Sequence, residues 1–212
     1  MMSKFAKLGS VRRSWDTAII GLLLLVWVFA SLTTSNFLTP LNFSYIFSNT
    51  SEIMIIAFAM LFMIILGEID LSVASILALG SSMLGWSYAK GAPIWMAILI
   101  CILVGTACGF VNGFLVTKLG LGSLAVTIGT LALYRGIANG LLGENTVNEF
   151  PEFWTSFGFD TIGKSFMPKT LPLIIIFGIL FGLLLHKTPF GRRTLAIGQS
   201  PEAAKFAGVN VV

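Results

Sequence analysis

Charged residues are scarce in this chain of 212 residues, where Asp, Glu, Lys and Arg together make up 10%. Soluble domains carry about 25% charged residues. Hydrophobic residues reach 56%, and the mean hydropathy is +0.93, so too little polar surface is left to cover a core in water. The scarcity of charge excludes an ordinary soluble domain and predicts an all-α, polytopic helical protein of the lipid bilayer.

Histidine and cysteine are nearly absent, with one His and two Cys. His186 has no cysteine at a spacing typical of a zinc site. On one helix Cys101 and Cys108 would stand about 10.5 Å apart, too far for a disulfide. We therefore expect no metal ligands, no cofactor and no catalytic residues, and we expect that the chain is not an enzyme.

The net charge of +4 does not indicate a nucleic-acid partner, because the cations form no single stripe. They flank apolar segments instead, before the first, at Lys118 after the fourth, and at Lys187, Arg192 and Arg193 after the sixth. Such cations mark the cytoplasmic side of a membrane protein. No small-residue cleavage site follows the first segment, which predicts an uncleaved helix.

Six apolar segments predict about six transmembrane helices, over residues 17–33, 44–66, 71–89, 93–117, 121–142 and 171–185. Six spans with both ends in the cytoplasm place all the cationic clusters on one side. The prediction makes residues 1–16 a cytoplasmic tail, 143–170 an extracytoplasmic loop rich in acids and aromatics, and 188–212 a cytoplasmic segment.

The most informative stretch is Gly67-Glu68-Ile69-Asp70-Leu71-Ser72, which puts two acids between two apolar runs. Each uncharged run is only about 21 to 24 Å long as a helix, against a hydrocarbon core of roughly 30 Å. Acids beside such runs are costly in lipid unless they face protein, water or a helix terminus. Short, Gly-interrupted membrane helices are also typical of transport paths.

Glycine recurs every four residues in three of the segments. The repeats are Gly105, Gly109 and Gly113, then Gly136 and Gly140, then Gly178 and Gly182. Small residues at this spacing let helices approach closely in lipid. We expect packing within the chain, with a face for a second chain as the alternative.

Residues 158–165 match the phosphate-loop pattern G-x-x-x-x-G-K-[ST]. The pattern binds phosphate only between a strand and a helix, whereas here it lies in the predicted outer loop and Pro168 and Pro172 follow. We interpret the match as chance. A nucleotide, if one is used, would bind to another chain.

A short helix is predicted over Ser200–Gly208. Ser200 suits the cap, Pro201 the first turn, Glu202 the helix dipole and Gly208 the terminating position. It would lie on the cytoplasmic face as an ordinary loop helix or as a docking element seated in a partner's groove.

Three stretches together resemble the bacterial sugar permeases of ribose type. They are residues 67–75, residues 126–136 with Val126-Thr127-Ile128-Gly129-Thr130-Leu131 and Tyr134-Arg135-Gly136, and residues 190–208 from Phe190-Gly191-Arg192 to Gly208. The resemblance covers residues 37–212. It implies one permease domain over 1–212 that looks like the amino-terminal part of such a permease, either a fragment or a truncated gene product.

The resemblance implies a membrane subunit of an ABC importer in the bacterial inner membrane. Its partners would be ATP-binding cassette ATPase subunits, a second permease chain (identical or different) and a periplasmic sugar-binding protein. The family usually has Gly where this chain has Glu68 and often Gly where it has Ala74, so the sugar stays open, with the rhamnose or autoinducer branch expected. Residues 188–212 would be the coupling segment, with candidates at Gly191, Arg192, Gly198, Ser200, Pro201, Glu202, Ala203, Ala204 and Gly208.

In that reading Glu68, Asp70, Ser72, Ser75 and Arg135 are candidates for the translocation path. Asp70 would cap the third span with or without touching sugar. Glu68 could equally be a water-exposed interfacial acid, and Arg135 could pair between helices or reach the outer headgroups. The rival function is an ion-coupled secondary transporter with Glu68 and Asp70 as its cation site.

Overall fold

The computed structural model describes residues 2–143, 145–163, 165 and 167–211, with side chains from Trp15 onward. The predictions made for Glu144, for Lys164 and for the side chains of the cations before Trp15 fall outside this part of the chain. The described residues form helices without any named strand, as predicted. Only one isolated bridge, between Thr161 and Pro168, has extended pairing among them.

Nine helices follow one another in the described residues. They are α1 (Met2–Thr33), α2 (Pro40–Leu66), α3 (Val73–Ala89), α4 (Ile94–Thr117), α5 (Ser123–Leu142), α6 (Glu152–Phe159), α7 (Leu171–Lys187), α8 (Pro189–Gln199) and α9 (Pro201–Phe206). Each of the six predicted spans corresponds to one of α1 to α5 or α7. Helices α6 and α8 were not predicted as separate elements.

Fewer helices are long enough to cross a bilayer than the sequence predicts. Four have the length and the apolar composition for it, namely α1 from Trp15, α2, α4 and α5. A fifth span counts if α7 and α8, which meet at a bend of 70°, are taken together. Helix α3 has 17 residues, which is about 25 Å, so it needs the extended residues before it to cover the same depth. The protein is nonetheless a polytopic helical membrane protein.

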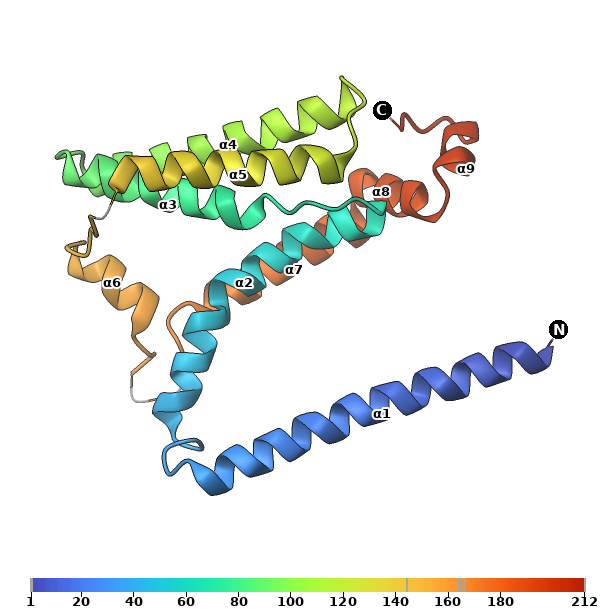
Figure 1. Cartoon of the computed structure of the whole chain (residues 1–212), viewed down its shortest axis with the longest axis horizontal. Helices are drawn as coiled ribbons and strands as arrows, with labels where there is room; N and C mark the ends of the chain where they lie inside the picture. Colours follow the sequence, from blue (N-terminus) through green and yellow to red (C-terminus); the bar gives the residue numbers. More distant parts are fainter. Residues whose placement is uncertain (1, 144, 164, 166, 212) are drawn as a thin grey trace.

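The helices pack in two groups (Figure 1). Helices α3, α4 and α5 contact one another, and α2 contacts α7 and α8. The first group holds the apolar core of Leu79, Cys108, Tyr134 and Ala138. Helix α1 diverges from both groups in Figure 1, and no residue of its spanning window is buried, although Trp27 meets Phe43 near the start of α2 with ring centroids 5.9 Å apart. The non-helical residues 67–72 join the two groups.

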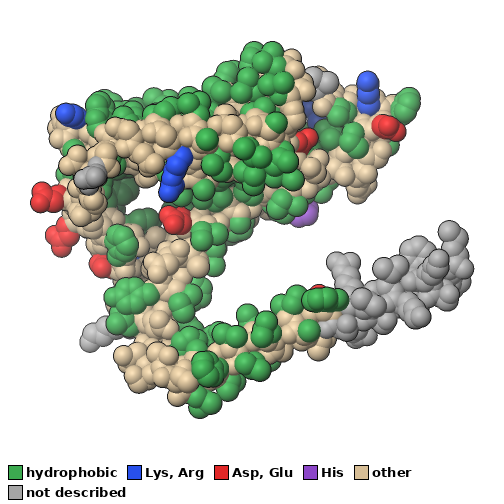
Figure 2. Space-filling model, viewed as in Figure 1, with side chains coloured by type: hydrophobic (Ala, Val, Ile, Leu, Met, Phe, Trp, Pro, Cys, Tyr) green, Lys and Arg blue, Asp and Glu red, His purple; other side chains and the backbone are tan. Residues whose placement is uncertain are grey.

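Segments predicted to share a membrane side lie toward one end of the molecule. The beginning of α1, the end of α4, and helices α8 and α9 lie toward one end, whereas α6 lies toward the other (Figure 1). Hydrophobic side chains cover the flanks in Figure 2, and the few charged ones gather mostly toward the two ends. This distribution is the one that lipid around the middle of the molecule requires.

The glycine repeats do not all pack as predicted. A Cβ on Gly178 would lie 3.2 Å from Phe58, and one on Gly105 would lie 3.9 Å from Ile76, so these positions face neighbouring helices. The prediction of packing within the chain is wrong for the other repeat positions, where nothing lies within 4 Å of the added Cβ: Gly109, Gly113, Gly136, Gly140 and Gly182.

Candidate functional site

The predicted interruption between the second and third spans is present. Helix α2 ends at Leu66, and Gly67 takes the left-handed conformation with φ of 76°. Its N–H donates to the Ile64 carbonyl, and the Glu68 N–H donates to the Met63 carbonyl. A left-handed glycine that closes the last turn in this way is a common helix ending, because other residues meet a steric penalty there. The backbone stays non-helical until α3 begins at Val73.

Asp70 binds the N-cap residue of α3 instead of being that residue. The residue at the N-cap of α3 is Ser72, whose hydroxyl makes no bond to the helix amides. Asp70 Oδ1 instead accepts both the Ser72 N–H at 2.8 Å and the Ser72 hydroxyl at 2.6 Å. The prediction that Asp70 is itself the capping residue is therefore wrong. Its carboxylate fixes the residue that begins the helix, as an Asx turn does.

Ser72 continues this contact into the α3–α5 group through a buried polar chain. Asn112 Nδ2 on α4 donates to Ser72 Oγ at 2.8 Å. The Tyr134 hydroxyl on α5 lies 3.2 Å from both Asn112 Oδ1 and the Cys108 carbonyl oxygen. Ser72, Asn112 and Tyr134 are 0%, 6% and 5% exposed. We call Asp70, Ser72, Asn112 and Tyr134 the polar chain.

The sequence reading missed Asn112 altogether and used Tyr134 only as part of a motif. Asn112 could have been found from its surroundings in the sequence, because it is an amide within a 24-residue helix that carries no charged residue. A polar side chain in such a helix must find a partner on a neighbouring helix, because lipid offers none. Which partner it finds depends on the fold.

The non-helical stretch is held inside protein at one end: Ser72 is fully buried and Asp70 is half-buried, whereas Gly67, Glu68, Ile69 and Leu71 are exposed. The Thr127 hydroxyl on α5 bonds its own helix at Ser123 O and also approaches the Ile69 carbonyl at 3.4 Å. Asn112 lies five residues before the end of α4 at Thr117, so Ser72 sits about 7.5 Å inside that end. Irregular backbone at such depth is tolerated only where it is buried in protein or lines a water-filled cavity.

The remaining path candidates divide by exposure. Ser75 is buried, and its hydroxyl donates to the Ser72 carbonyl at 2.6 Å. Glu68 and Arg135 are both exposed, and Asp70 is half-buried. The structure thus brings Asp70, Ser72 and Ser75 together and leaves Glu68 and Arg135 outside the polar chain.

The cytoplasmic segment forms two capped helices after α7. Thr188 caps α8, accepting the Gly191 N–H at 3.2 Å. Ser200 caps α9, accepting the Ala203 N–H at 3.2 Å, and Gly208 has φ of 81°. The predicted capping at Ser200 and the left-handed Gly208 are confirmed, although the helix itself ends at Phe206.

Two glycines of this segment stand where no side chain fits. A Cβ on Gly191 would lie 2.0 Å from the Leu185 carbonyl oxygen of α7, and one on Gly198 would lie 2.1 Å from the Ile65 carbonyl oxygen of α2. On α9, Ala204 is 3% exposed, whereas Glu202 and Ala203 are exposed, as is Arg192 on α8. The outward surface of α9 therefore includes Ala203 but not Ala204.

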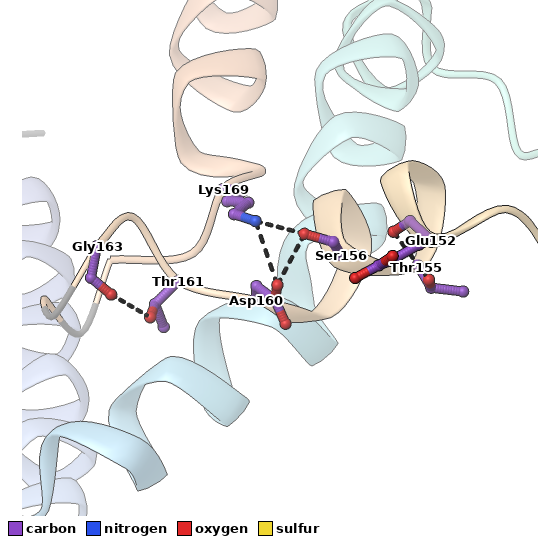
Figure 3. Close-up of polar contacts among 7 residues, drawn as sticks. All are labelled: Glu152, Thr155, Ser156, Asp160, Thr161, Gly163 and Lys169. Carbon is purple, nitrogen blue, oxygen red and sulfur yellow. Dashed lines mark hydrogen bonds and ion pairs between the residues drawn. The ribbon is translucent and has the colours of Figure 1, made fainter.

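The predicted outer loop carries its own polar cluster (Figure 3). The Ser156 hydroxyl donates to Asp160 Oδ2 at 2.7 Å, and Lys169 Nζ lies 3.2 Å from the same oxygen and also bonds Ser156. The hydrogen bond from Ser156, followed by that from Lys169, lowers the pKa of Asp160 below its usual value. The cluster fastens the carboxyl end of α6 to the start of α7.

The phosphate-loop pattern has none of the surroundings that phosphate binding needs. Gly158 lies within α6, so helix rather than strand leads into the pattern. The next helix, α7, begins only at Leu171. Lys164 is outside the described residues. Among the residues searched, no three His, Cys, Asp or Glu side chains gather as a metal site would require.

Comparison with known proteins gives a consistent result. Residues 42–212 match the family model described as branched-chain amino acid transport system / permease component. The autoinducer 2 import system permease protein LsrD of Klebsiella pneumoniae is 32% identical, over 95% of this chain and 62% of its own length. The ribose import permease protein RbsC of Bacillus subtilis is 34% identical, over 91% of this chain and 59% of its own.

A third relative, LsrD of Yersinia enterocolitica, is 31% identical over 94% of this chain and 62% of its own length. The chain thus spans between 59% and 62% of the length of these curated relatives. All three are import permeases by name. No solved structure matches the chain.

Proposed function

Because this chain belongs to the branched-chain amino acid transport system / permease component family, and within it to the ribose-type sugar permeases, we propose that it is a membrane-spanning permease subunit of a binding-protein-dependent ABC importer. It would move a simple sugar into the cell across the bacterial inner membrane, with its amino terminus in the cytoplasm. ATP hydrolysis on partner chains would supply the energy.

One observation supports this proposal most strongly: the non-helical residues 67–72 interrupt two apolar segments and end at Ser72, which is fully buried against α4. Their polar groups bond to Asn112 and Thr127 of two other helices. Interrupted helices whose free backbone groups point into protein are where membrane transporters build substrate paths. We place Asp70, Ser72 and Ser75 beside the path, and Glu68 and Arg135 at its margins.

The named relatives favour a sugar or a sugar-derived signal as substrate, since one imports ribose and two import autoinducer 2 by name. The description of the family model names branched-chain amino acids instead. We expect the autoinducer or rhamnose branch. Glu68→Gly, which restores the residue usual in the family, should leave folding intact and alter the preference among these sugars in a competition assay.

Outside the cell, the loop over 143–170 would receive the sugar-binding protein. Tyr88, Asn148 and Glu149 rim an open hollow of about 670 Å³ at the end of α3, and Tyr88 stacks on Phe150 with ring centroids 5.2 Å apart. Aromatic side chains within a polar rim are typical of protein-binding surfaces. Inside the cell, α9 would dock on an ATPase subunit, with a second permease chain completing the importer.

The docking role of α9 can be tested on its outward surface. Ala203 is the residue to enlarge, because a bulky residue at the buried Ala204 would disrupt the fold rather than the contact. Ala203→Trp should reduce co-purification with the ATPase and uptake together while membrane levels hold. Unchanged co-purification and unchanged uptake would contradict the docking assignment.

The function as a whole is tested by uptake into right-side-out membrane vesicles, loaded with ATP, from cells that express the gene with its natural neighbours. Labelled ribose, rhamnose and autoinducer 2 serve as probes. We expect uptake to require ATP and the binding protein and to survive an uncoupler that dissipates ion gradients. Uptake that collapses with the ion gradient and ignores ATP would support the rival, an ion-coupled transporter using Glu68 and Asp70.

A further inference from the structure

Helix α8 is fastened to the last turns of α2 at both of its ends. Near its start, Phe190 meets Phe62 with ring centroids 5.7 Å apart. Near its finish, Gly198 lies so close to α2 that an added Cβ would stand 2.1 Å from the Ile65 carbonyl oxygen and 3.0 Å from Ile65 Cγ2. Figure 1 shows α8 beside the end of α2. Ile65 is two residues before Gly67, where the interrupted stretch begins.

The connections on the other sides of α8 are just as tight. At its start the chain bends by 70° from α7, with Gly191 packed against the Leu185 carbonyl and Thr188 capping the new helix. At its finish Ser200 ends α8, and its hydroxyl oxygen accepts the Ala203 N–H that begins α9. Helix α9, with Ala204 buried, contacts α8 directly. A continuous packed route therefore leads from α9 through α8 to the end of α2.

We propose that Gly198 is the positioning residue that makes α8 and the end of α2 one mechanical body, so that a displacement of α9 shifts residues 67–72. This inference rests on the proposed function, since it takes the ATPase subunits as the source of the displacement. It assigns a role to the contact between Gly198 and Ile65, which lies outside both the polar chain and the docking surface of α9.

The physical reason lies in the stiffness of the contact. Backbone packed on backbone has no flexible side chain that could absorb a shift, so a movement of one helix must move the other. Packed interfaces of this kind convert small displacements into discrete rearrangements rather than gradual deformation. Any residue larger than glycine at 198 has to push α8 away from α2. The packing between Gly198 and Ile65, which links the two helices, would then be lost.

The first test is Gly198→Ala in the assembled transporter, with Gly182→Ala as the matched control. The control adds the same methyl group on α7 where nothing lies within 4 Å. We expect Gly198→Ala to lower the stimulation of ATP hydrolysis by binding protein and sugar about tenfold relative to the control. Stimulation equal to that of the control would overturn the proposal.

The second test does not depend on how well that variant folds. Phe62→Cys with Phe190→Cys, in a chain whose Cys101 and Cys108 are replaced by Ser, allows α2 and α8 to be joined by a short reducible cross-linker. If the two move as one body, joining them leaves ATP-driven uptake at the level of the same variant without linker. Loss of uptake on cross-linking, with recovery on reduction, would overturn the proposal.

The proposed importer function and the proposed role of Gly198 would be contradicted by different results. If the unsubstituted protein shows no ATP-driven uptake, the proposed function fails before the contact is tested. If that uptake is normal and either the alanine or the cross-linking result goes against expectation, only the role of Gly198 fails.

Discussion

Helices α1 and α5 are both candidate membrane spans, yet they differ in burial and in polarity. No part of the α1 window is buried, whereas 28% of the α5 window is. The buried one is also the least hydropathic of the four candidates. Its polar residues Thr127, Thr130 and Tyr134 are the ones that face inward.

The difference shows what holds this molecule together. In lipid the hydrophobic effect does not draw two apolar helices toward each other, since the lipid tails are as apolar as leucine. Hydrogen bonds and close packing do so instead. Helix α5 offers a tyrosine hydroxyl to α4, whereas Ser31 and Thr33 of α1 donate to carbonyls of their own helix, at Trp27 O and Phe29 O.

The largest contrast should come from one leucine in each region. Leu79→Ala, in the core with Cys108, Tyr134 and Ala138, should lower the free energy of unfolding by about 2–5 kcal/mol. Leu24→Ala on α1, where the side chain is 57% exposed, should change it by less than about 0.5 kcal/mol. Thermal unfolding of the purified protein in one detergent measures both. Equal losses would contradict the comparison.

The next effect should come from the centre of the polar chain. Asn112→Leu removes the donor to Ser72 and an acceptor near Tyr134, and leaving such groups buried without partners costs about 1–3 kcal/mol. We expect lower thermal stability and a large loss of uptake at matched membrane levels. Asn139→Leu, at an exposed position of α5, is the control. If the two variants behave alike, the polar chain does not hold residues 67–72 in place.

A smaller effect is expected from changes at Asp70. Asp70→Asn keeps an oxygen that can accept the Ser72 N–H and hydroxyl, and Asp70→Ser keeps part of that capacity, so both should retain substantial uptake. Asp70→Leu removes the acceptor, a loss that costs about 0.5–2 kcal/mol for a helix start. This variant should lose most of its uptake. Uptake at matched membrane levels decides. If Asp70→Asn is as inactive as Asp70→Leu, the negative charge itself is required in the path.

The smallest effect belongs to the exposed cluster of Ser156, Asp160 and Lys169. Because these partners lower the pKa of Asp160, its contribution to loop stability is present above its unfolded pKa and is lost as the pH falls through the lowered folded value. The protection factors of the Ile162 and Lys169 amides, which bond Met167 and Asp160, should therefore fall in acid once the exchange rates are corrected for the pH dependence of free amides. Asp160→Asn should abolish this pH dependence, and Glu149→Gln should preserve it.

Local signals predicted the local structure well. The helix ending at Gly67, the cap at Ser200 and the left-handed Gly208 are each specified by residues within one turn of the feature. The family was also evident from motifs, because they keep their order and spacing along the chain. Asp70 was assigned to the right helix start but in the wrong bond, since Ser72 competes for the same position.

The sequence by itself determined that this protein lies in a membrane, where its helices run, and that the second and third spans are interrupted. Hydropathy and capping depend on residues that are close together in the sequence, so they can be predicted without knowing the tertiary structure. Only the tertiary structure decided that Asn112 meets Ser72, 40 residues away, that Gly198 packs on Ile65, and that α1 diverges from both groups after Trp27 meets Phe43 of α2. Those outcomes depend on which helices become neighbours, and in lipid that choice is made by a few polar and small residues whose partners are distant in the chain.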